Sequence, residues 1–403
     1  MCIAFFWIAV LLIAYTYAIF PGVVFLRGAI CRRPVRSAEI TPTVSLIIAA
    51  HNEAESIGAK LDNVLSLNYP PDRLEVLIAL DGSTDETEAI VGSYADRGVR
   101  LLALPRQGKA SALNTAVAAS SGEVLAFSDA NSIFAQDAIR SLVRPLADPS
   151  VGGVAGDQRY LSGRGESVAS DGERTYWSFD RKLKHFQSQA GNVISATGAI
   201  YAIRRVLFRT VPPDVTDDFV TSINVIAQGY RLVFAPDAIA YEPVAKSGGA
   251  EFGRKVRVIT RGLRGVIEMR TLLNPFDHGF YAIQLFSHKV LRRLVAVPVL
   301  LLLFVSPLLW SEGVPYQAAA LLQWGICVAG ALGAVFNEHR LGRLKIFRIP
   351  FFFCMVNAAS LMAALNIVRG RRINLWEPQR TEPSTPDVAR AVAVPPTGEV
   401  VVR

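Results

Sequence analysis

The feature that most constrains the fold is the gathering of apolar residues into long blocks at both ends of the chain. Ile3–Leu26 precedes a long polar stretch, and three further blocks follow it at Leu294–Trp310, Ala318–Phe336 and Ile349–Val368. Each block has about 17 to 24 residues, which is enough for a helix to cross the hydrocarbon core of a bilayer. The blocks account for a hydrophobic content of 51% and a mean hydropathy of +0.32. We therefore expect transmembrane helices over residues 1–26 and 294–368, with a polar domain between them.

Basic residues predict which side of the membrane carries that domain. Four arginines follow the first block: Arg27, Arg32, Arg33 and Arg36. The positive-inside rule then places the following domain in the cytoplasm. The first block is long and lacks a basic stretch before it, unlike a signal peptide, so we interpret it as an anchor in the inner (plasma) membrane. Three more crossings would put the C-terminus outside, yet Arg369, Arg371 and Arg372 favour the cytoplasm, so its side stays open.

The polar stretch alternates short apolar runs with segments of helical periodicity. The runs are Val44–Ala49, Leu74–Leu80, Val99–Leu104 and Val124–Phe127. Helical patterns follow His51, run from Thr84 to about Ala95, and cover Ala110–Ala119. Strands alternating with helices imply parallel βαβ units, and near-continuous apolar runs imply a sheet covered on both faces. The sequence thus predicts an α/β, Rossmann-like domain over residues 43–250, after a basic linker at 27–42.

The alternation weakens after about Val154. The Gly- and Ser-rich stretch Arg159–Arg174 predicts a mobile loop, Tyr176–Gln189 a helix and Ile194–Ile203 a strand. Two amphipathic helices are then expected over residues 251–293. The first has an arginine face opposite an apolar face that includes Phe252 and Ile267, and the second begins near Phe276. Both patterns are typical of helices in a membrane interface.

Charge and cysteine usage narrow the partners. The net charge of +8 suits contact with anionic membrane lipids. Nucleic acid is not expected, because the basic residues form no binding module with interleaved aromatic residues. The four cysteines lie in or beside the apolar blocks, without zinc spacing. The tail at 369–403 is basic and then rich in Pro, Val and Thr, which predicts disorder.

Asp81 lies in "LDGSTD", at the end of a predicted strand, where parallel sheets bind ligands. Its carboxylate could accept hydrogen bonds from a base or a ribose. The alternative is a plain turn followed by a helix cap, because Ser83 and Glu86 have capping-box spacing.

Asp129 and Asn131, in "FSDANS", follow another strand end. Hard divalent cations take oxygen ligands and often keep phosphates as further ligands, so this pair could hold Mg²⁺ or Mn²⁺ against a diphosphate. The alternative is an Asx turn that caps the next helix.

Asp217 and Asp218, in "TDDF", are adjacent acids that could supply a general base, or simply cap a helix over Val220–Gln228. Lys109 could reach a phosphate or be a solvated residue at a helix start. The stripe of Arg254, Arg257, Arg261 and Arg264 suits a diphosphate or lipid head groups equally well.

The order of these motifs, with membrane blocks around them, resembles membrane-bound family 2 glycosyltransferases of the GT-A fold. "VSLIIAAHNEAESI" resembles the family's opening strand with its Asn-Glu signature, "LDGSTD" its nucleoside-binding element and "GKASALN" a segment near the donor. "FSDANS" resembles the metal-binding Asp-x-Asp element, and "TDDF" the element with the general base. The resemblance implies donor contacts for Glu53, Asp81, Lys109 and Asp129, a metal at Asp129 and Asn131, and a base at Asp218 beside Asp217.

Three departures from the family pattern matter. Leu80 replaces an Asp, Asn131 replaces an Asp, and "RVITRG" (257–262) stands where processive members carry Gln-x-x-Arg-Trp. Only Arg261 matches there, and with Arg257 it is expected to close over the diphosphate. Because the missing Trp helps such polymerases to hold the acceptor end, we favour transfer of one or a few sugars.

The resulting expectation is an inverting, metal-dependent hexosyltransferase that uses a nucleotide-sugar, with UDP favoured. Its acceptor would be a lipid-linked or growing glycan in cell-surface polysaccharide or glycolipid synthesis, with polysaccharide-assembly proteins as further partners. A processive synthase coupled to secretion and a catalytically degenerate membrane scaffold are the alternatives. The sequence specifies neither the sugar nor the oligomeric state.

Overall fold

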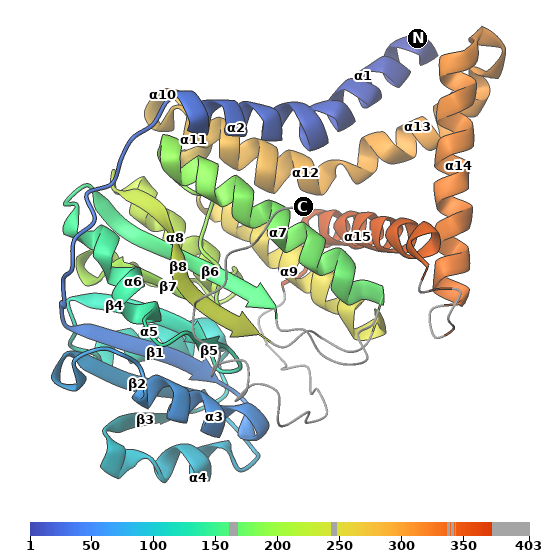
Figure 1. Ribbon diagram of the computed structural model, residues 1–403. Helices are drawn as coiled ribbons and strands as arrows, with labels where there is room; N and C mark the ends of the chain where they lie inside the picture. Colours follow the sequence, from blue (N-terminus) through green and yellow to red (C-terminus); the bar gives the residue numbers. More distant parts are fainter. Residues whose placement is uncertain (161–167, 243–247, 337–338, 340–341, 343, 373–403) are drawn as a thin grey trace, which may run out of the picture.

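The protein has an α/β part and a helical part that meet along two long helices (Figure 1). A computed structural model describes the chain except residues 161–167, 243–247, 337–338, 340–341, 343 and 373–403. The predicted disordered tail therefore lies outside the described residues from position 373 on.

The α/β part is built on an eight-stranded mixed sheet in the order β3-β2-β1-β4-β7-β6-β8-β5. The strands are β1 (Val44–Ala50), β2 (Leu74–Asp81), β3 (Val99–Leu104), β4 (Val124–Asp129), β5 (Ile133–Phe134), β6 (Val151–Tyr160), β7 (Tyr201–Arg204) and β8 (Arg231–Glu242). Strands β1 to β4 are mutually parallel, β7 is antiparallel to both β4 and β6, and β6 is parallel to β8. The predicted parallel α/β sheet is thus confirmed, and its four predicted strands are all present.

Helices cover both faces of the sheet at β1, so every side chain of β1 is buried. One core joins Leu46 and Ile48 to α3 (Ala54–Leu65), α4 (Thr87–Gly92) and α6 (Ala138–Val143). The other core joins Ile47 and Ala49 to α5 (Lys109–Ala119) and α8 (Asp217–Ala227). The carboxyl ends of β1, β2 and β4 consequently open at one edge, which is where ligands bind to sheets of this kind.

Three local predictions are corrected. Residues 168–174 were expected in a loop, but helix α7 begins at Val168 and runs to Ala190, and its face with Phe179, Leu183 and Phe186 packs on the first membrane helix. The strand expected from Ile194 is only β7, starting at Tyr201. Helix α4 begins at Thr87 rather than Thr84, because the Asp85 carboxylate, not Ser83, accepts the Thr87 amide hydrogen bond at 3.1 Å.

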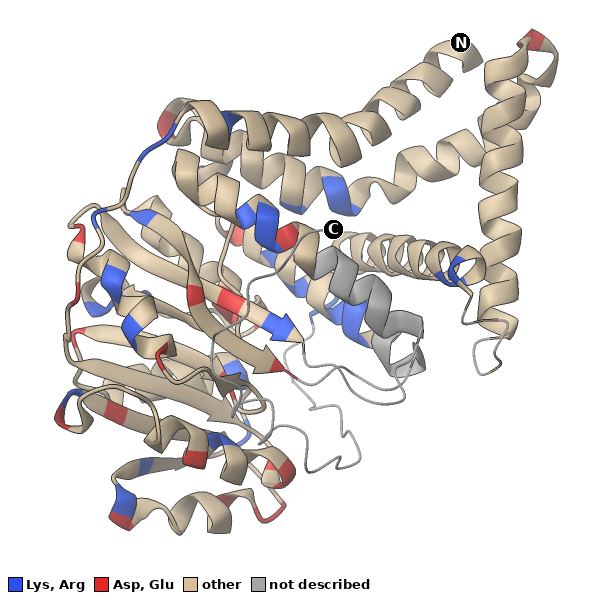
Figure 2. Ribbon diagram, in the orientation of Figure 1, with Lys and Arg blue, Asp and Glu red and all other residues tan. Residues whose placement is uncertain are grey.

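Long apolar helices make up the helical part. The first segment joins α1 (Cys2–Ala14), the π-helical turn η1 (Tyr15–Ile19) and α2 (Phe20–Ile30), and the last two helices are α14 (Val314–Val335) and α15 (Lys345–Val368). Within the described residues, these three segments are long and apolar enough to cross a membrane. A fourth candidate is the pair Phe280–Leu294 and Ala296–Leu308 (α13), which meet at a 46° bend. Figure 2 shows these helices nearly free of charge along much of their length, with basic residues where they approach the α/β part.

The helices expected in the membrane interface take a different role. Part of the apolar face of α9 (Gly248–Glu268) is buried inside the protein, since Ile259 and Leu263 pack against Ala359 and Ala363 of α15, whereas Ile267 on that face is 51% exposed. The second expected helix is divided at Gly279 into α10 (Pro275–His278) and α11 (Phe280–Leu285), followed by the π-helical turn η7 (Phe286–Leu291) and α12 (Arg292–Leu294). Gly279 breaks it because its φ of 54° lies in the left-handed region, which favours glycine.

Candidate active site

Two loops at the carboxyl ends of β1 and β2 are joined by hydrogen bonds. Asn52 has a left-handed φ of 53°, which lets its side-chain carbonyl accept from the Thr84 amide at 2.8 Å while its own amide donates to Ser83 Oγ at 3.1 Å. Glu53 follows at the start of α3 and accepts a 2.7 Å hydrogen bond from Ser56 Oγ. Burial raises the pKa of the Glu53 carboxyl, helped by the charges of Asp129 and Asp85. The sequence-predicted Glu53 therefore lies at the expected edge of the sheet.

Asp81 is 1% exposed and organises the next loop. Its carboxylate accepts hydrogen bonds from the Arg106 guanidinium at 2.8 Å and from the Gln107 and Gly108 amides at 2.7 and 2.8 Å. These bonds fix the turn at Gly108, where φ is 96°, and so fix the start of α5. In this structure Asp81 thus positions Lys109, the residue after Gly108. Contact of Asp81 with a nucleotide stays a prediction.

Lys109 connects the motifs. Its Nζ lies 2.6 Å from Asp129 Oδ1 and 3.3 Å from Asp217 Oδ2. Burial by itself would lower the pKa of Lys109, but the charges of Asp129 and Asp217 outweigh it and raise the pKa. One ammonium therefore joins the end of β4 to the start of α8.

Asp218 lies in the first turn of α8, where it accepts the Phe219 amide hydrogen bond at 2.7 Å. Burial and the neighbouring Asp217 raise its pKa to about 6, while Lys109 lowers it. A carboxylate with that pKa is ionised at neutral pH and is more basic than an ordinary aspartate. It therefore suits a general base.

Gly198 lies close against the carboxylate at the end of β4. A Cβ atom at Gly198 would come within 2.8 Å of Asp129 Oδ2, so only a glycine leaves this carboxylate its space. Asn131 is exposed two residues further on. Among the described residues no three His, Cys, Asp or Glu side chains form a metal cluster. A carboxylate and an amide oxygen nevertheless fit a hard cation that takes its other ligands from a diphosphate.

Lys60 is a functional candidate that the sequence patterns did not suggest. It is completely buried beneath "FSDANS", and its Nζ donates to Ser128 Oγ at 2.7 Å and to the Ser132 carbonyl at 2.5 Å. Ser132 Oγ in turn donates to Glu242 at 2.6 Å. Lys60 therefore supports both ends of the segment that carries Asp129 and Asn131.

The arginine stripe of α9 faces the protein at its C-terminal half. The Arg261 guanidinium donates to the Val215 carbonyl at 3.0 Å and to Pro213, while Arg264 lies 3.5 Å from Asp214. These contacts hold the loop before Asp217, so Arg261 and Arg264 face the protein, whereas the sequence left a diphosphate and lipid head groups equally open for the stripe. Contacts of Arg257 and Arg261 with a diphosphate stay predictions.

Residues 45–211, which contain the β1, β2 and β4 edge, match the family described as Glycosyl transferase family 2. The chain therefore contains a glycosyltransferase family 2 domain. This agrees with the acidic motifs at the ends of the parallel strands and confirms the resemblance seen in the sequence.

Similar proteins support the same assignment for this glycosyltransferase. It is 29% identical over 217 residues to the probable glycosyltransferase YdaM of Bacillus subtilis (50% of each chain). It is 25% identical over 239 residues to a poly-β-1,6-N-acetyl-D-glucosamine synthase of Staphylococcus aureus (58% of this chain, 57% of the relative). The matches thus span little more than half the length of these curated relatives.

A solved structure resembles the glycosyltransferase over nearly its whole length. It is the mannosyltransferase PcManGT from Pyrobaculum calidifontis, in complex with GDP-Man and Mn²⁺, with a TM-score of 0.69 and 26% identity. The similarity covers 91% of this chain and 100% of that one. It therefore includes helices beyond the α/β part.

The structure brings most of the predicted site residues of the glycosyltransferase together. Lys109 contacts both Asp129 and Asp217, and Asp218 is next to Asp217. Arg261 reaches the same motif only through the backbone of Val215. In such an arrangement the Lys109 ammonium can pair with an anion, the carboxylates can bind a cation, and Asp218 can accept a proton.

Proposed function

We propose that this family 2 enzyme transfers a sugar from a nucleotide-sugar, with UDP-sugars favoured, to a hydroxyl of a membrane-associated or growing glycan, with inversion at the anomeric carbon. The observation that carries the proposal is the cluster of Lys109, Asp129, Asp217 and Asp218 at the carboxyl ends of the strands. The relative that makes poly-β-1,6-N-acetyl-D-glucosamine supports a role in exopolysaccharide or glycolipid synthesis.

Asp218 acts as the general base in this proposal. Its carboxylate takes the proton of the acceptor hydroxyl, and the acceptor oxygen forms a bond to the anomeric carbon. The bond between that carbon and the diphosphate oxygen breaks, and the nucleoside diphosphate leaves with the electron pair. A single displacement of this kind inverts the anomeric centre. The raised pKa of Asp218, caused first by burial, supports this role.

The remaining site residues bind and orient the donor. Asp129 and Asn131 would hold Mg²⁺ or Mn²⁺, which when bound neutralises charge on the leaving diphosphate. Glu53 and Asp81 contribute to the nucleotide side, and Arg257 and Arg261 to the diphosphate side. The Lys109 ammonium contacts both the Asp129 and the Asp217 carboxylates, and its positive charge offsets the repulsion between them.

The membrane part would hold this cleft over its acceptor. The arginines after the first apolar segment, Arg27 among them, support an inner-membrane, multi-pass protein with its catalytic domain in the cytoplasm. Membrane lipids and polysaccharide-assembly proteins are the corresponding partners.

A processive synthase is the second candidate, supported by the same synthase relative. The missing Trp favours the transfer of one or a few sugars instead. Gly262 stands where processive members carry Trp, and the flexible end of the Arg293 side chain lies against it.

Donor turnover by the full chain in nanodiscs tests the proposal. UDP-, GDP- and dTDP-sugars are supplied with Mn²⁺ or Mg²⁺ and with membrane lipid extract as acceptor, and nucleoside diphosphate release is measured beside product length. We expect one donor to react, Asp218→Asn to abolish release, and donor binding by calorimetry to persist in that variant. A product ladder would favour the processive synthase. Absence of donor binding in the parent protein would favour the alternative that the protein is a catalytically degenerate membrane scaffold.

A further inference from the structure

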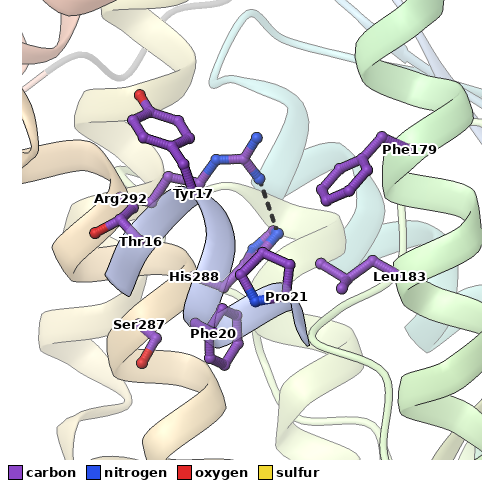
Figure 3. A pocket seen from close by; sticks show the side chains of 9 residues that line it. All are labelled: Thr16, Tyr17, Phe20, Pro21, Phe179, Leu183, Ser287, His288 and Arg292. Atoms are coloured by element: carbon purple, nitrogen blue, oxygen red, sulfur yellow. Dashed lines mark hydrogen bonds between the residues drawn. The ribbon is translucent and has the colours of Figure 1, made fainter. Parts of the chain in front are cut away.

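Buried hydroxyls that have no hydrogen-bond partner among the described residues gather around the acidic cluster. They belong to Tyr201 of β7 and to Thr216 and Thr221 at the start of α8. Another such polar atom, His288 Nδ1, belongs to the small cavity between α2, α7 and η7, whose lining includes no acid (Figure 3). A buried hydroxyl without a partner carries a free-energy cost. The hydroxyls beside the acids therefore call for a functional explanation.

Tyr201 is held against the strand that carries Asp129. It stands opposite Phe127 in the antiparallel pair of β4 and β7, and the two rings stack at 4.7 Å with 15° between their planes. Phe127 and Asp129 are two residues apart on β4, so their side chains point to the same face of the sheet. Tyr201 is 1% exposed, and its stacked ring thus keeps the hydroxyl on the face that carries the acids.

The start of α8 packs in the same core as Tyr201. Asp217 and Thr221 are four residues apart, which places them on one face of the helix, and they are 8% and 1% exposed. Ser222 Oγ accepts a 3.0 Å hydrogen bond from the Ala196 amide, which ties α8 to the segment before β7. Burial raises the pKa of the Tyr201 hydroxyl well above its usual value, and the charge of Asp217 raises it further. The hydroxyl therefore stays protonated and can donate.

The contacts of Lys109 explain why a spare donor would be useful here. Its ammonium lies 2.6 Å from Asp129 and 3.3 Å from Asp217. In the proposed donor complex Asp129 binds the metal and Lys109 the diphosphate, and an ammonium paired with a diphosphate no longer neutralises Asp217. A buried carboxylate that loses its cation needs another donor. Tyr201 can serve, because its hydroxyl has no other hydrogen bond to give up.

We propose that Tyr201 is a positioning residue for the acid pair: its hydroxyl donates a hydrogen bond to Asp217 when Lys109 turns from Asp217 to the diphosphate of the donor. This inference rests on the proposed function, since the exchange requires a bound nucleotide-sugar. The new hydrogen bond holds Asp217 in place. Asp218, the next residue of α8, consequently keeps its orientation toward the acceptor hydroxyl.

A double-mutant cycle tests the exchange without relying on catalysis. Tyr201→Phe removes only the hydroxyl and keeps the ring on Phe127, so with Lys109 present the thermal midpoint of the full chain should not fall. In Lys109→Met the Asp217 carboxylate has lost its cation, and the Tyr201 hydroxyl should become its donor. In that background Tyr201→Phe should lower the midpoint by about 3 °C, as expected for one hydrogen bond to a charged group. Lys109→Gln is the second background, and whichever of the two folds carries the cycle.

Donor affinity tests the role of Tyr201 in the proposed reaction. Calorimetry of the full chain in nanodiscs uses the nucleotide-sugar that the turnover screen identifies, with Mn²⁺. Because the hydrogen bond forms only in the donor complex, Tyr201→Phe should weaken donor binding about tenfold. The control is Tyr281→Phe, since the buried Tyr281 hydroxyl donates to the Ile194 carbonyl at 3.0 Å. This control should lower the thermal midpoint and leave donor affinity unchanged.

Equal midpoint changes for Tyr201→Phe in the two backgrounds would overturn the proposal, because the hydroxyl would then not serve Asp217. A donor affinity of Tyr201→Phe equal to that of the parent protein would also overturn it, since the exchange would then not accompany donor binding. A parent protein that binds no donor would instead contradict the proposed function. The cycle would in that case decide alone whether the Tyr201 hydroxyl replaces Lys109 at Asp217.

Discussion

At the scale of single residues, Lys109 decides how the acidic side chains at the strand ends are arranged. Its ammonium is within 3.3 Å of carboxylates from two motifs that are far apart in the sequence. Without it, Asp129, Asp217 and Asp218 would repel one another in a partly buried place. The proposed role of Asp218 as a general base therefore depends on Lys109, whose charge lowers the pKa of the Asp218 carboxyl.

This dependence predicts a pH profile. The base must be ionised, and the pKa of Asp218 is about 6, so the transfer rate should be level above that pH and fall about tenfold per pH unit below it. Lys109 lowers the pKa of Asp218, hence Lys109→Met should raise it and move the acidic limb to higher pH. Initial rates between about pH 5 and 8 measure this. Lys182→Met, at an exposed position, should keep the parent profile, and an unshifted Lys109→Met profile would contradict the prediction.

Lys60 gives a second prediction at this scale. Replacing it by Met removes the donor for the buried Ser132 carbonyl, which should cost about 1–3 kcal/mol of unfolding free energy. It should also raise the Mn²⁺ concentration needed for half-maximal transfer, because the Asp129–Asn131 segment loses its support. Denaturant unfolding and a Mn²⁺ titration of the rate measure the two effects. Arg97→Met, which breaks an exposed 2.9 Å ion pair with Asp62, should cost no more than about 1 kcal/mol. An unchanged Mn²⁺ requirement in Lys60→Met would refute the supporting role.

The sequence contained a signal for Lys60 that motif analysis passes over. In α3 the buried positions are Ile57, Lys60, Leu61 and Val64, so a lysine stands on the apolar face of an amphipathic helix. A charged residue at such a position needs a buried partner. The partner itself could not be predicted, since Ser128 and Ser132 reach Lys60 only through the packing of α3 on the sheet.

At the scale of secondary-structure elements, α9 is held between the last membrane helix and α8. Ile259 and Leu263 pack on α15, whereas Gly265 faces the rings and methyl groups of α8. A Cβ atom at Gly265 would lie 2.8 Å from Phe219 Cδ1 and 3.1 Å from a methyl carbon of Val220. The glycine thus allows α9 to approach the start of the helix that carries Asp218.

Two glycine substitutions in α9 should consequently have opposite effects. Gly265→Ala should destabilise the protein by about 1–3 kcal/mol, since it overpacks against buried Phe219. Gly253→Ala has nothing within 4 Å of the new Cβ and should gain about 0.5–1 kcal/mol from helix propensity. Thermal unfolding in one detergent compares them directly. Equal midpoints for the two variants would show that α9 does not approach α8 as closely as described.

The elements themselves were predicted unevenly. Strands β1, β2 and β4 follow from apolar runs because a covered parallel strand must be apolar on both faces, whereas in the edge strand β3 only Val99 is buried. Helix α7 was missed at its start because its first residues lie in a Gly- and Ser-rich stretch, whereas Phe179, Leu183 and Phe186, which pack on α2, lie in its later turns. For α9 the two faces were identified correctly, but the sequence could not distinguish lipid from α15 as the partner of the apolar face.

At the scale of the whole molecule, the last membrane helix is connected to the active site through α9. Ala359 and Ala363 of α15 are completely buried against Ile259 and Leu263. Between these two residues on α9, Arg261 holds the carbonyl of Val215, two residues before Asp217. The apolar helix α15 therefore helps, through α9, to fix the loop before Asp217.

The connection predicts a long-range effect of a substitution in the membrane. Ala363→Phe should force α15 and α9 apart, because a buried alanine leaves no space for a ring, and overpacking of this kind costs about 1–3 kcal/mol. The strain should weaken the hydrogen bond from Arg261 to the Val215 carbonyl, so the rate of transfer should fall. Donor affinity should stay near the parent value, because it depends mainly on the residues at the strand ends. Initial rates and calorimetric donor binding in nanodiscs separate the two. Leu365→Phe is the matched control, since Leu365 is 46% exposed on the same helix and a larger ring there meets no packed neighbour. A rate for Ala363→Phe equal to that of this control would mean that the membrane helices anchor the enzyme without shaping its active site.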